Sequence, residues 1–324
     1  MSTTGATHAS GEASTPPSAE AIRLGLGAIR RNRHRRLHLY GHFLELGWHV
    51  VRPGTVRATL PVTRRLWDDR GVVAATPIAT LADVAMGLAL RSRRQATGMR
   101  FATASLDIHH AEAPRSGRVT AVATVFAAEG SLGLVRCEVT APGARPVALA
   151  TGAFLCRPLP AGIEAPDLRV VKRMATRPPA EGPWDAGLSA EERRFVVDLG
   201  RALERQLGAA DPFAAYLGIE VLDAPQGEAR IRLPAAATVA NRVGHVQDGV
   251  LHGLAALACG RAAGGRPRGV SVRFLRPAAT GTVTAAARVV HTGREVAVVQ
   301  CDLTDDEGRL VATATASVQR ATEG

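Results

Sequence analysis

The sequence predicts an α+β protein made of two tandem copies of one domain, each an antiparallel sheet wrapped around a central helix. One reason is an internal repeat in which the same residues return 173 positions later. A period this long indicates domain duplication, because solenoid repeats run to about 20–50 residues. The other reason is the order of patterns in each copy: two strands, a glycine loop, a helix rich in small residues, then four strands. The recurring residues are Gly54, Arg57, Leu60, Pro61, Gly71, Val73, Leu81, Ala82 and Gly87, which return as Gly227, Arg230, Leu233, Pro234, Gly244, Val246, Leu254, Ala255 and Gly260.

Length and composition agree with two globular domains. A chain of 324 residues allows about two domains of roughly 150 residues each. Apolar residues at 46% and charged residues at 21% are enough for each half to bury a core. The formal charge of +11 comes mostly from arginine. It reflects either a GC-rich genome or attraction of an anion such as a CoA thioester, a nucleic acid or a membrane surface, and charge alone does not decide.

Cysteine usage and hydropathy point to the cytoplasm. The four cysteines show no metal-binding spacing and read as small buried hydrophobes in a reducing compartment; they are Cys137, Cys156, Cys259 and Cys301. No apolar run reaches about 18 residues, and the first residues lack the basic and apolar regions of a signal peptide. We therefore expect a cytoplasmic protein without a membrane partner.

The first copy is expected in residues 18–156, after a disordered tail over 1–17 that is rich in Ser, Thr, Gly and Pro. Ser18 can cap a helix that runs into a basic cluster, Arg30, Arg31, Arg33, Arg35 and Arg36. This cluster is a solvated helix face or, as the weaker reading, a nucleic-acid contact. Next come strands over 46–51 and 55–62 and a helix over 77–93. The last four strands are predicted over 100–109, 118–126, 132–140 and 146–155.

A Pro-rich linker over 157–187 leads to the second copy, in residues 188–324. Ser189 and Glu192 form a capping box that opens a helix ending near Leu207. The following elements are two strands over 218–222 and 228–233, a helix over 248–263, and strands over 269–275, 281–291, 295–303 and 310–319. Each sheet leaves an edge strand, so we expect the two edges to pair into one sheet, as an intramolecular pseudo-dimer.

Three segments carry a resemblance to hotdog-fold acyl-CoA thioesterases of the PaaI-like, phenylacetyl-CoA kind. Residues 241–251 resemble the family loop Asn-x-x-Gly-x-Val-His-Gly-Gly, and residues 78–83 resemble the helix signature that ends in Thr-Leu-Ala-Asp. Residues 274–277 are similar to a Phe-Leu-Arg-Pro strand end. The resemblance covers roughly residues 40–156 and 212–321. It implies two tandem hotdog domains and hydrolysis of an acyl-CoA thioester.

The resemblance also implies roles for the site residues. In that family the helix aspartate is base or nucleophile, the backbone N–H of the first loop glycine binds the thioester oxygen, and the asparagine helps to place water. Opposite protomers supply these groups. The chemistry is reasonable, because a helix N-terminus offers unpaired donors to a developing oxyanion and a buried carboxylate has a raised pKa.

Each copy keeps only half of this pattern. The first copy keeps the helix aspartate, Asp83, but has Asp68, Ala74, Ala75 and Thr76 at the loop positions. The second copy has Ala256 at the aspartate position but keeps most of the loop, as Asn241, Gln247, Asp248 and Gly249. We therefore predict one composite site, with Asp83 facing the loop of the second copy. Thr103 is the candidate for a family Ser/Thr that orients the acid or water, with Ser105 second. Arg276 neutralises CoA phosphates or caps a strand end.

Two departures from the family pattern bear on this prediction. Gln247 replaces the histidine, so it can hydrogen-bond but does not titrate. Asp248 replaces the first glycine, and a carboxylate beside an oxyanion is unfavourable unless it points away. On purely structural grounds, Asp83 would be a satisfied polar residue and Asn241 a loop turn.

The predicted function is that of an acyl-CoA thioesterase. The alternative is a non-catalytic, regulatory protein that binds acyl-CoA or lipid. A hotdog hydratase ranks last, because it needs an Asp/His or Glu/His pair that the matching positions lack. We expect no metal and no redox cofactor. Further association of chains and the identity of the acyl group stay open.

Overall fold

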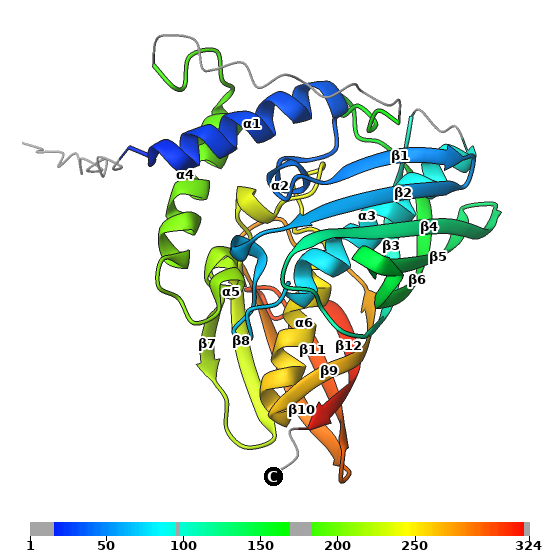
Figure 1. Ribbon diagram of the computed structural model, residues 1–324, viewed down its shortest axis with the longest axis vertical. Coiled ribbons are helices and arrows are strands. Elements are labelled where there is room, and N and C mark those ends of the chain that lie inside the picture. The colour runs from blue at the N-terminus through cyan, green and yellow to red at the C-terminus, as the bar shows by residue number, and fades with distance from the viewer. Residues whose placement is uncertain (1–15, 95–97, 169–182, 321–324) are drawn as a thin grey trace, which may run out of the picture.

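The computed structural model describes residues 16–94, 98–168 and 183–320 and places them in two similar halves (Figure 1). In the first half, the helices are α1 (Ala19–Arg35), α2 (Leu39–Phe43) and α3 (Ala75–Arg94). The strands are β1 (Gly47–Arg52), β2 (Thr55–Val62), β3 (Met99–His110), β4 (Gly117–Glu129), β5 (Leu132–Ala141) and β6 (Arg145–Pro158). The predicted order of elements is confirmed here.

The second half repeats this order. Its helices are α4 (Ala190–Gln206), α5 (Pro212–Leu217) and α6 (Asp248–Ala263). Its strands are β7 (Glu220–Asp223), β8 (Glu228–Pro234), β9 (Gly265–Phe274), β10 (Thr282–Thr292), β11 (Val296–Thr304) and β12 (Leu310–Arg320). The short helices α2 and α5 were not predicted, because five or six residues show too little periodicity to be recognised.

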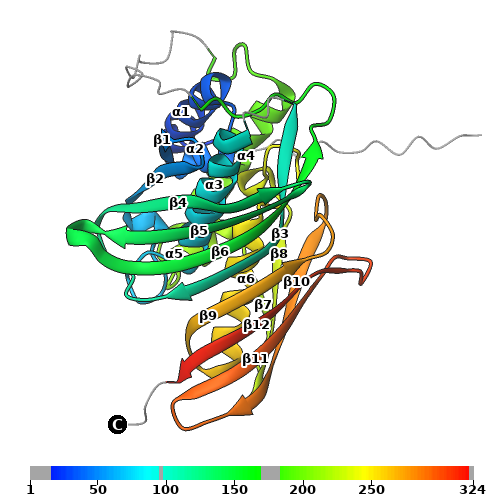
Figure 2. The same cartoon turned by 90° about the vertical axis from the view of Figure 1, so that its right-hand side faces the viewer.

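The two halves share one antiparallel sheet, in which the described strands run β1-β2-β4-β5-β6-β3-β9-β12-β11-β10-β8-β7. β3 and β9 form the junction, with Asp107 opposite Ser271 near its centre (Figure 2). An ion pair of 2.7 Å between Asp107 and Arg273 also crosses the junction. The predicted pairing of the two edge strands into one sheet is therefore confirmed.

The sheet wraps around α3 and α6, which also pack against each other. Most residues of both helices are buried, as expected for helices that are apolar on every side. Small residues permit the close contact. A Cβ atom at Gly249 would lie 2.5 Å from the backbone N of Thr80, and one at Gly253 would lie 1.9 Å from the hydroxyl oxygen of Thr76. The contact thus depends on two glycines of α6.

The leading helices α1 and α4 pack against each other at one end of the molecule (Figure 1). Ser18 caps α1, and Ser189 with Glu192 forms the predicted capping box of α4. Members of the basic cluster make contacts within the chain. Arg33 binds Glu192, and Arg35 lies over the ring of Trp48. These two arginines therefore have structural roles within the chain and are not simply part of a solvated helix face.

Other predictions fall outside these observations. The tail over 1–17 lies almost wholly outside the described residues, as does the middle of the 157–187 linker. The domain boundaries 18–156 and 188–324 remain predictions. Among the described residues, no helix is both long and apolar enough to cross a membrane.

Candidate functional site

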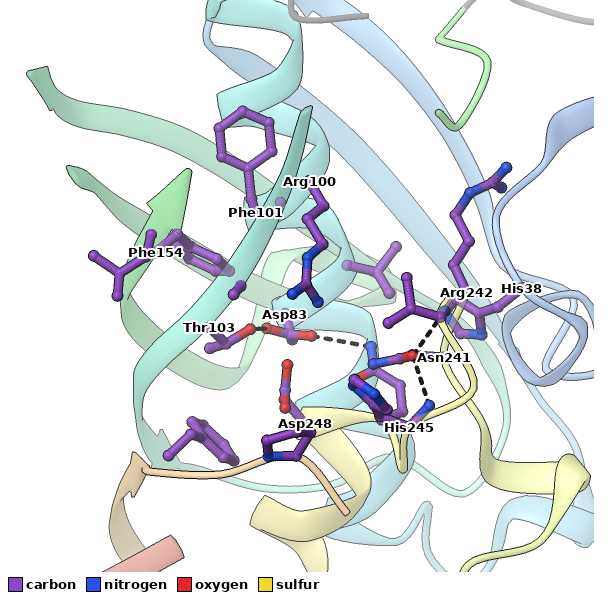
Figure 3. A pocket seen from close by; sticks show the side chains of 18 of the residues that line it. His38, Asp83, Arg100, Phe101, Thr103, Phe154, Asn241, Arg242, His245 and Asp248 are labelled. Carbon is purple, nitrogen blue, oxygen red and sulfur yellow. Dashed lines mark hydrogen bonds between the residues drawn. The ribbon is translucent and has the colours of Figure 1, made fainter. Parts of the chain in front are cut away.

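A cavity of about 360 Å³ lies where the two halves meet (Figure 3). Its walls come from α3 and β3 of the first half and, in the second half, from the 241–247 loop, the start of α6 and the end of β9. We call it the first cavity. The predicted site residues that line it are Asp83, Thr103, Asn241, Gln247, Asp248 and Arg276.

Asp83 is the centre of a hydrogen-bonded group in this cavity. It projects from the middle of α3, and only 6% of it is exposed. Its Oδ1 accepts a hydrogen bond of 2.9 Å from the Thr103 hydroxyl of β3. Its Oδ2 accepts one of 3.0 Å from Nε2 of Gln247, which belongs to the other half of the chain. The carboxyl group from one half is thus held by a side chain from the other.

The orientation of the Gln247 amide follows from the helix end that it caps. Gln247 is the N-cap of α6, and its Oε1 accepts a hydrogen bond of 3.3 Å from the backbone N–H of Gly249. Because Oε1 faces this donor, Nε2 is the atom that faces Asp83. Gln247 therefore presents only N–H donors to Asp83, and this favours the ionised carboxylate.

A second carboxyl group, that of Asp248, points toward Asp83 from the first turn of α6 (Figure 3). Burial raises the pKa of Asp83, although hydrogen bonds from Gln247 and Thr103 oppose the rise. Burial and then the charge of Asp83 raise the pKa of Asp248 to about 8. Two carboxyl groups this close resist ionising together, so we expect the pair to hold one proton at neutral pH. Gln247 donates to Asp83 and lowers its pKa, whereas the charge of Asp83 raises the pKa of Asp248, so we expect the proton on Asp248.

This arrangement answers the objection to an aspartate at position 248. The side chain does not point away from the cavity, contrary to the condition set by the sequence. Its pKa, raised to about 8, favours the neutral form at pH 7 instead, and a neutral carboxyl group can donate a hydrogen bond to an oxyanion rather than repel it.

Asn241 lies in the cavity wall, and its side-chain oxygen holds the loop. Its Oδ1 accepts hydrogen bonds of 3.0 Å and 3.1 Å from the backbone N–H groups of Val243 and His245. The matching residue of the first half, Asp68, does the same for the N–H groups of Arg70 and Val72. The side-chain oxygen of Asn241 therefore stabilises the turn of the loop, as the structural interpretation of this residue predicted.

Of the two remaining predicted residues, Arg276 lines the cavity and Gly249 takes part in helix packing. Arg276 lines the cavity, and its guanidinium donates to the carbonyl oxygen of Leu310 at 2.9 Å, so it also caps a strand end. Gly249 does not line the cavity among the described residues. Its N–H is bound to Gln247 and its Cα faces Thr80, so it acts through helix packing.

The structure adds three polar residues that the sequence did not single out, His38, Arg100 and Arg242 (Figure 3). His38 is buried, its Nδ1 accepts the backbone N–H of Gly41, and burial lowers its pKa to about 3. Its Nε2 therefore carries the proton. Arg242 directly follows Asn241, and this was an available signal. His38 gave none, because only the tertiary fold brings α2 to the cavity.

In the part of the chain that the structure describes, no three His, Cys, Asp or Glu side chains are grouped so that they could hold a metal ion. His109, His110 and Glu112 do not form such a group. Glu112 instead binds Arg266.

Comparison with known proteins agrees with this architecture. Residues 71–148 and 251–312 match the model of the thioesterase superfamily. A "putative esterase" of Saccharolobus solfataricus is 27% identical over 124 residues, which cover 36% of this chain and 89% of that protein.

Two solved structures are similar over most of the chain. A hotdog-fold protein from Alicyclobacillus acidocaldarius has a TM-score of 0.57 at 13% identity and covers 89% of this chain and 99% of its own. An "oleoyl thioesterase (putative)" from Lactobacillus plantarum has a TM-score of 0.54 at 13% identity, with coverage of 84% and 99%. At such identity these similarities show the fold alone.

Proposed function

We propose that this tandem hotdog chain, whose halves both match the thioesterase superfamily, hydrolyses an acyl-CoA thioester in the first cavity. The observation that carries the proposal is the bridge across the halves, in which Gln247 donates to the buried carboxylate of Asp83. A desolvated carboxylate held between two fixed donors is suited to remove a proton or attack a carbonyl carbon.

In the base route, Asp83 takes a proton from water while the water oxygen bonds to the thioester carbon. The start of α6 and the neutral Asp248 carboxyl group face the oxygen that becomes negative, and both stabilise it as hydrogen-bond donors. The C–S bond then breaks, the sulfur takes a proton, and a carboxylic acid and free CoA leave. Arg100, Arg242 and Arg276 line the same cavity and suit the phosphates of CoA.

In the nucleophile route, an oxygen of Asp83 bonds to the thioester carbon and the thiolate leaves first. Water then hydrolyses the resulting anhydride. Label in Asp83 after one turnover in ¹⁸O-labelled water identifies the nucleophile route, because the label enters Asp83 only when water attacks the Asp83 carbonyl carbon of the anhydride.

A panel of acyl-CoA thioesters, assayed by release of free thiol, tests the function and finds the preferred acyl group. Asp83→Asn keeps the size of the side chain and is expected to lower kcat by about 10²–10⁴-fold. Asp302→Asn, at an exposed position of β11, is the matched control and should retain full activity. Normal turnover by Asp83→Asn contradicts the assignment. Binding of the thioesters without turnover by the wild type would favour the alternative, a binding protein.

A further inference from the structure

A second cavity lies on the other side of the pair of central helices, at the place related to the first by the pseudo-symmetry of the two halves. Its volume is about 590 Å³, compared with about 360 Å³ for the first. Both values lie within the range of small-molecule sites, about 300–1,000 Å³. The proposed function makes no use of this second cavity.

A shared irregularity of the sheet shows which residues of the two cavities correspond. β3 has a bulge at Ala104 in its pairing with β6, and β9 has one at Arg268 in its pairing with β12. Aligning the bulges matches Thr103 with Pro267. It also matches Ala102 and Ala104 with Arg266 and Arg268. The strands thus correspond 164 positions apart, whereas the central helices correspond 173 positions apart.

The reacting groups of the first cavity all have apolar counterparts in the second. Asp83 corresponds to Ala256, Thr103 to Pro267, Gln247 to Ala74 and Asp248 to Ala75, and each of these counterparts lines the second cavity. The second cavity therefore lacks the base and the donors that hydrolysis requires.

The second cavity nevertheless has more arginines than aspartates, although Glu112 pairs with two of the arginines, Arg266 and Arg268. Among the described residues that line them, the first cavity has four arginines and two aspartates, and the second has five arginines and three aspartates. Two of these arginines replace alanines of the first cavity. Arg266 and Arg268 are held in place by the exposed Glu112 and by the carbonyl oxygen of Ala111.

Most of the rest of the lining is apolar, and its polar members are Thr76, Gln319 and His110. His110 lines this cavity, and its buried Nε2 has no hydrogen-bond partner among the described residues. Burial lowers the pKa of His110 to about 3, so the ring is neutral. The apolar wall is formed by Ile78, Val147, Phe213, Leu217, Ile219 and Leu257.

We propose that the second cavity binds a CoA thioester without hydrolysing it, with phosphates at Arg266 and Arg268 and the acyl chain against the apolar wall. The choice of ligand rests on the proposed function, because both cavities combine the same excess of arginine with an apolar wall. The site is a binding site in addition to the catalytic one, and it uses residues from both halves.

Calorimetric titration with S-octyl-coenzyme A tests this proposal, because a thioether has no carbonyl group to hydrolyse. We expect two equivalents to bind the wild type. Gly87→Phe fills the first cavity, since Gly87 lines it and a Cβ there meets no heavy atom within 4 Å. This variant should bind one equivalent.

Adding Arg266→Ala and Arg268→Ala to Gly87→Phe should weaken that remaining equivalent by about tenfold or more, because charge-assisted contacts are lost. Arg230→Ala with Arg232→Ala is the matched control, since both residues form exposed ion pairs on β8. The control should not change binding. If Gly87→Phe does not fold, the double arginine variant alone should bind one equivalent with wild-type affinity and the other about tenfold or more weakly.

Three results overturn the proposal. One equivalent in the wild type and none in folded Gly87→Phe would leave the proposed function standing and remove the second site. If the remaining equivalent binds with unchanged affinity after Arg266→Ala and Arg268→Ala, the ligand lies elsewhere. Absence of any binding to the folded wild type would overturn both proposals together.

Discussion

Replacing Asp248 with asparagine should stabilise the protein, and the gain should grow as pH rises. In the native state, burial and the charge of Asp83 raise the pKa of Asp248 from 3.8 to about 8. Between these two values the native protein keeps a proton that the unfolded chain releases. The free energy of unfolding of the wild type therefore falls as pH rises through this window. The stability that the bound proton of Asp248 contributes at low pH is lost above about pH 8. Asparagine does not titrate, so the variant lacks this fall.

The size of the effect follows from the same shift. At about 1.4 kcal/mol per tenfold change in acidity, a rise from 3.8 to about 8 corresponds to at most about 6 kcal/mol. The side chain is only partly buried, and water reaches a newly charged group there, so we expect about 1–3 kcal/mol at pH 8.5. An asparagine amide also fits the space and still donates a hydrogen bond.

Urea unfolding of both proteins at pH 5 and pH 8.5 measures this difference. The advantage of Asp248→Asn should be larger at pH 8.5 than at pH 5 by most of this amount, since the part that arises between pH 3.8 and pH 5 is present at both. Asp302→Asn, on the exposed face of β11, controls for the loss of one negative charge. A difference between Asp248→Asn and wild type that is the same at both pH values would refute the coupled carboxyl pair.

Two further variants probe the contacts around this pair. Gln247→Leu removes the N–H donor that lowers the pKa of Asp83. The acid limb of the plot of kcat against pH should therefore move to higher pH. An unchanged acid limb would mean that this hydrogen bond does not set the pKa of Asp83. Gly249→Ala should destabilise the fold by about 1–3 kcal/mol, because its Cβ would lie 2.5 Å from the backbone of Thr80. The control, Gly87→Ala, meets open space and should stabilise α3 by about 0.5–1 kcal/mol in the same unfolding assay; equal effects of the two substitutions would contradict the close contact of α3 with α6.

The fold was largely predictable because the local signals agree with each other. The helix predicted over 77–93 is α3, Ala75–Arg94, and the one predicted over 248–263 is α6 with the same bounds. The repeat predicted two copies, and the exposed edges predicted their pairing through β3 and β9. The short helices α2 and α5 were missed, because tertiary contacts rather than periodicity hold them in place.

The residues of the site could be predicted from the sequence, but the direction and protonation of the Asp248 side chain could not. The resemblance to hotdog thioesterases implied that Asp83 and the 241–249 loop meet from opposite halves, and Gln247 does contact Asp83. The direction of the Asp248 side chain depends on how α6 begins behind its cap, Gln247, and no sequence pattern reports this. The match of Thr103 with Pro267 was also hidden, because the repeat changes from 173 to 164 positions between the helix and the next strand.

Fusion of the two copies explains why one cavity can keep a buried carboxyl pair while the other does not. In a dimer of identical chains, every substitution appears in both cavities, so two such pairs must be kept and their desolvation destabilises the protein twice. In the fused chain, Ala256 and Pro267 remove these polar groups from the second cavity without touching Asp83 or Thr103. The structural oxygens that hold the loops persist in both halves, at Asp68 and Asn241. The base and the donors of the proposed reaction are lost from the second cavity. Its arginines also lie at different positions, because Asp69 and Glu112 replace Arg242 and Arg276 while Arg266 and Arg268 replace two alanines, which is the pattern expected when the second cavity takes a binding role of its own without the reaction.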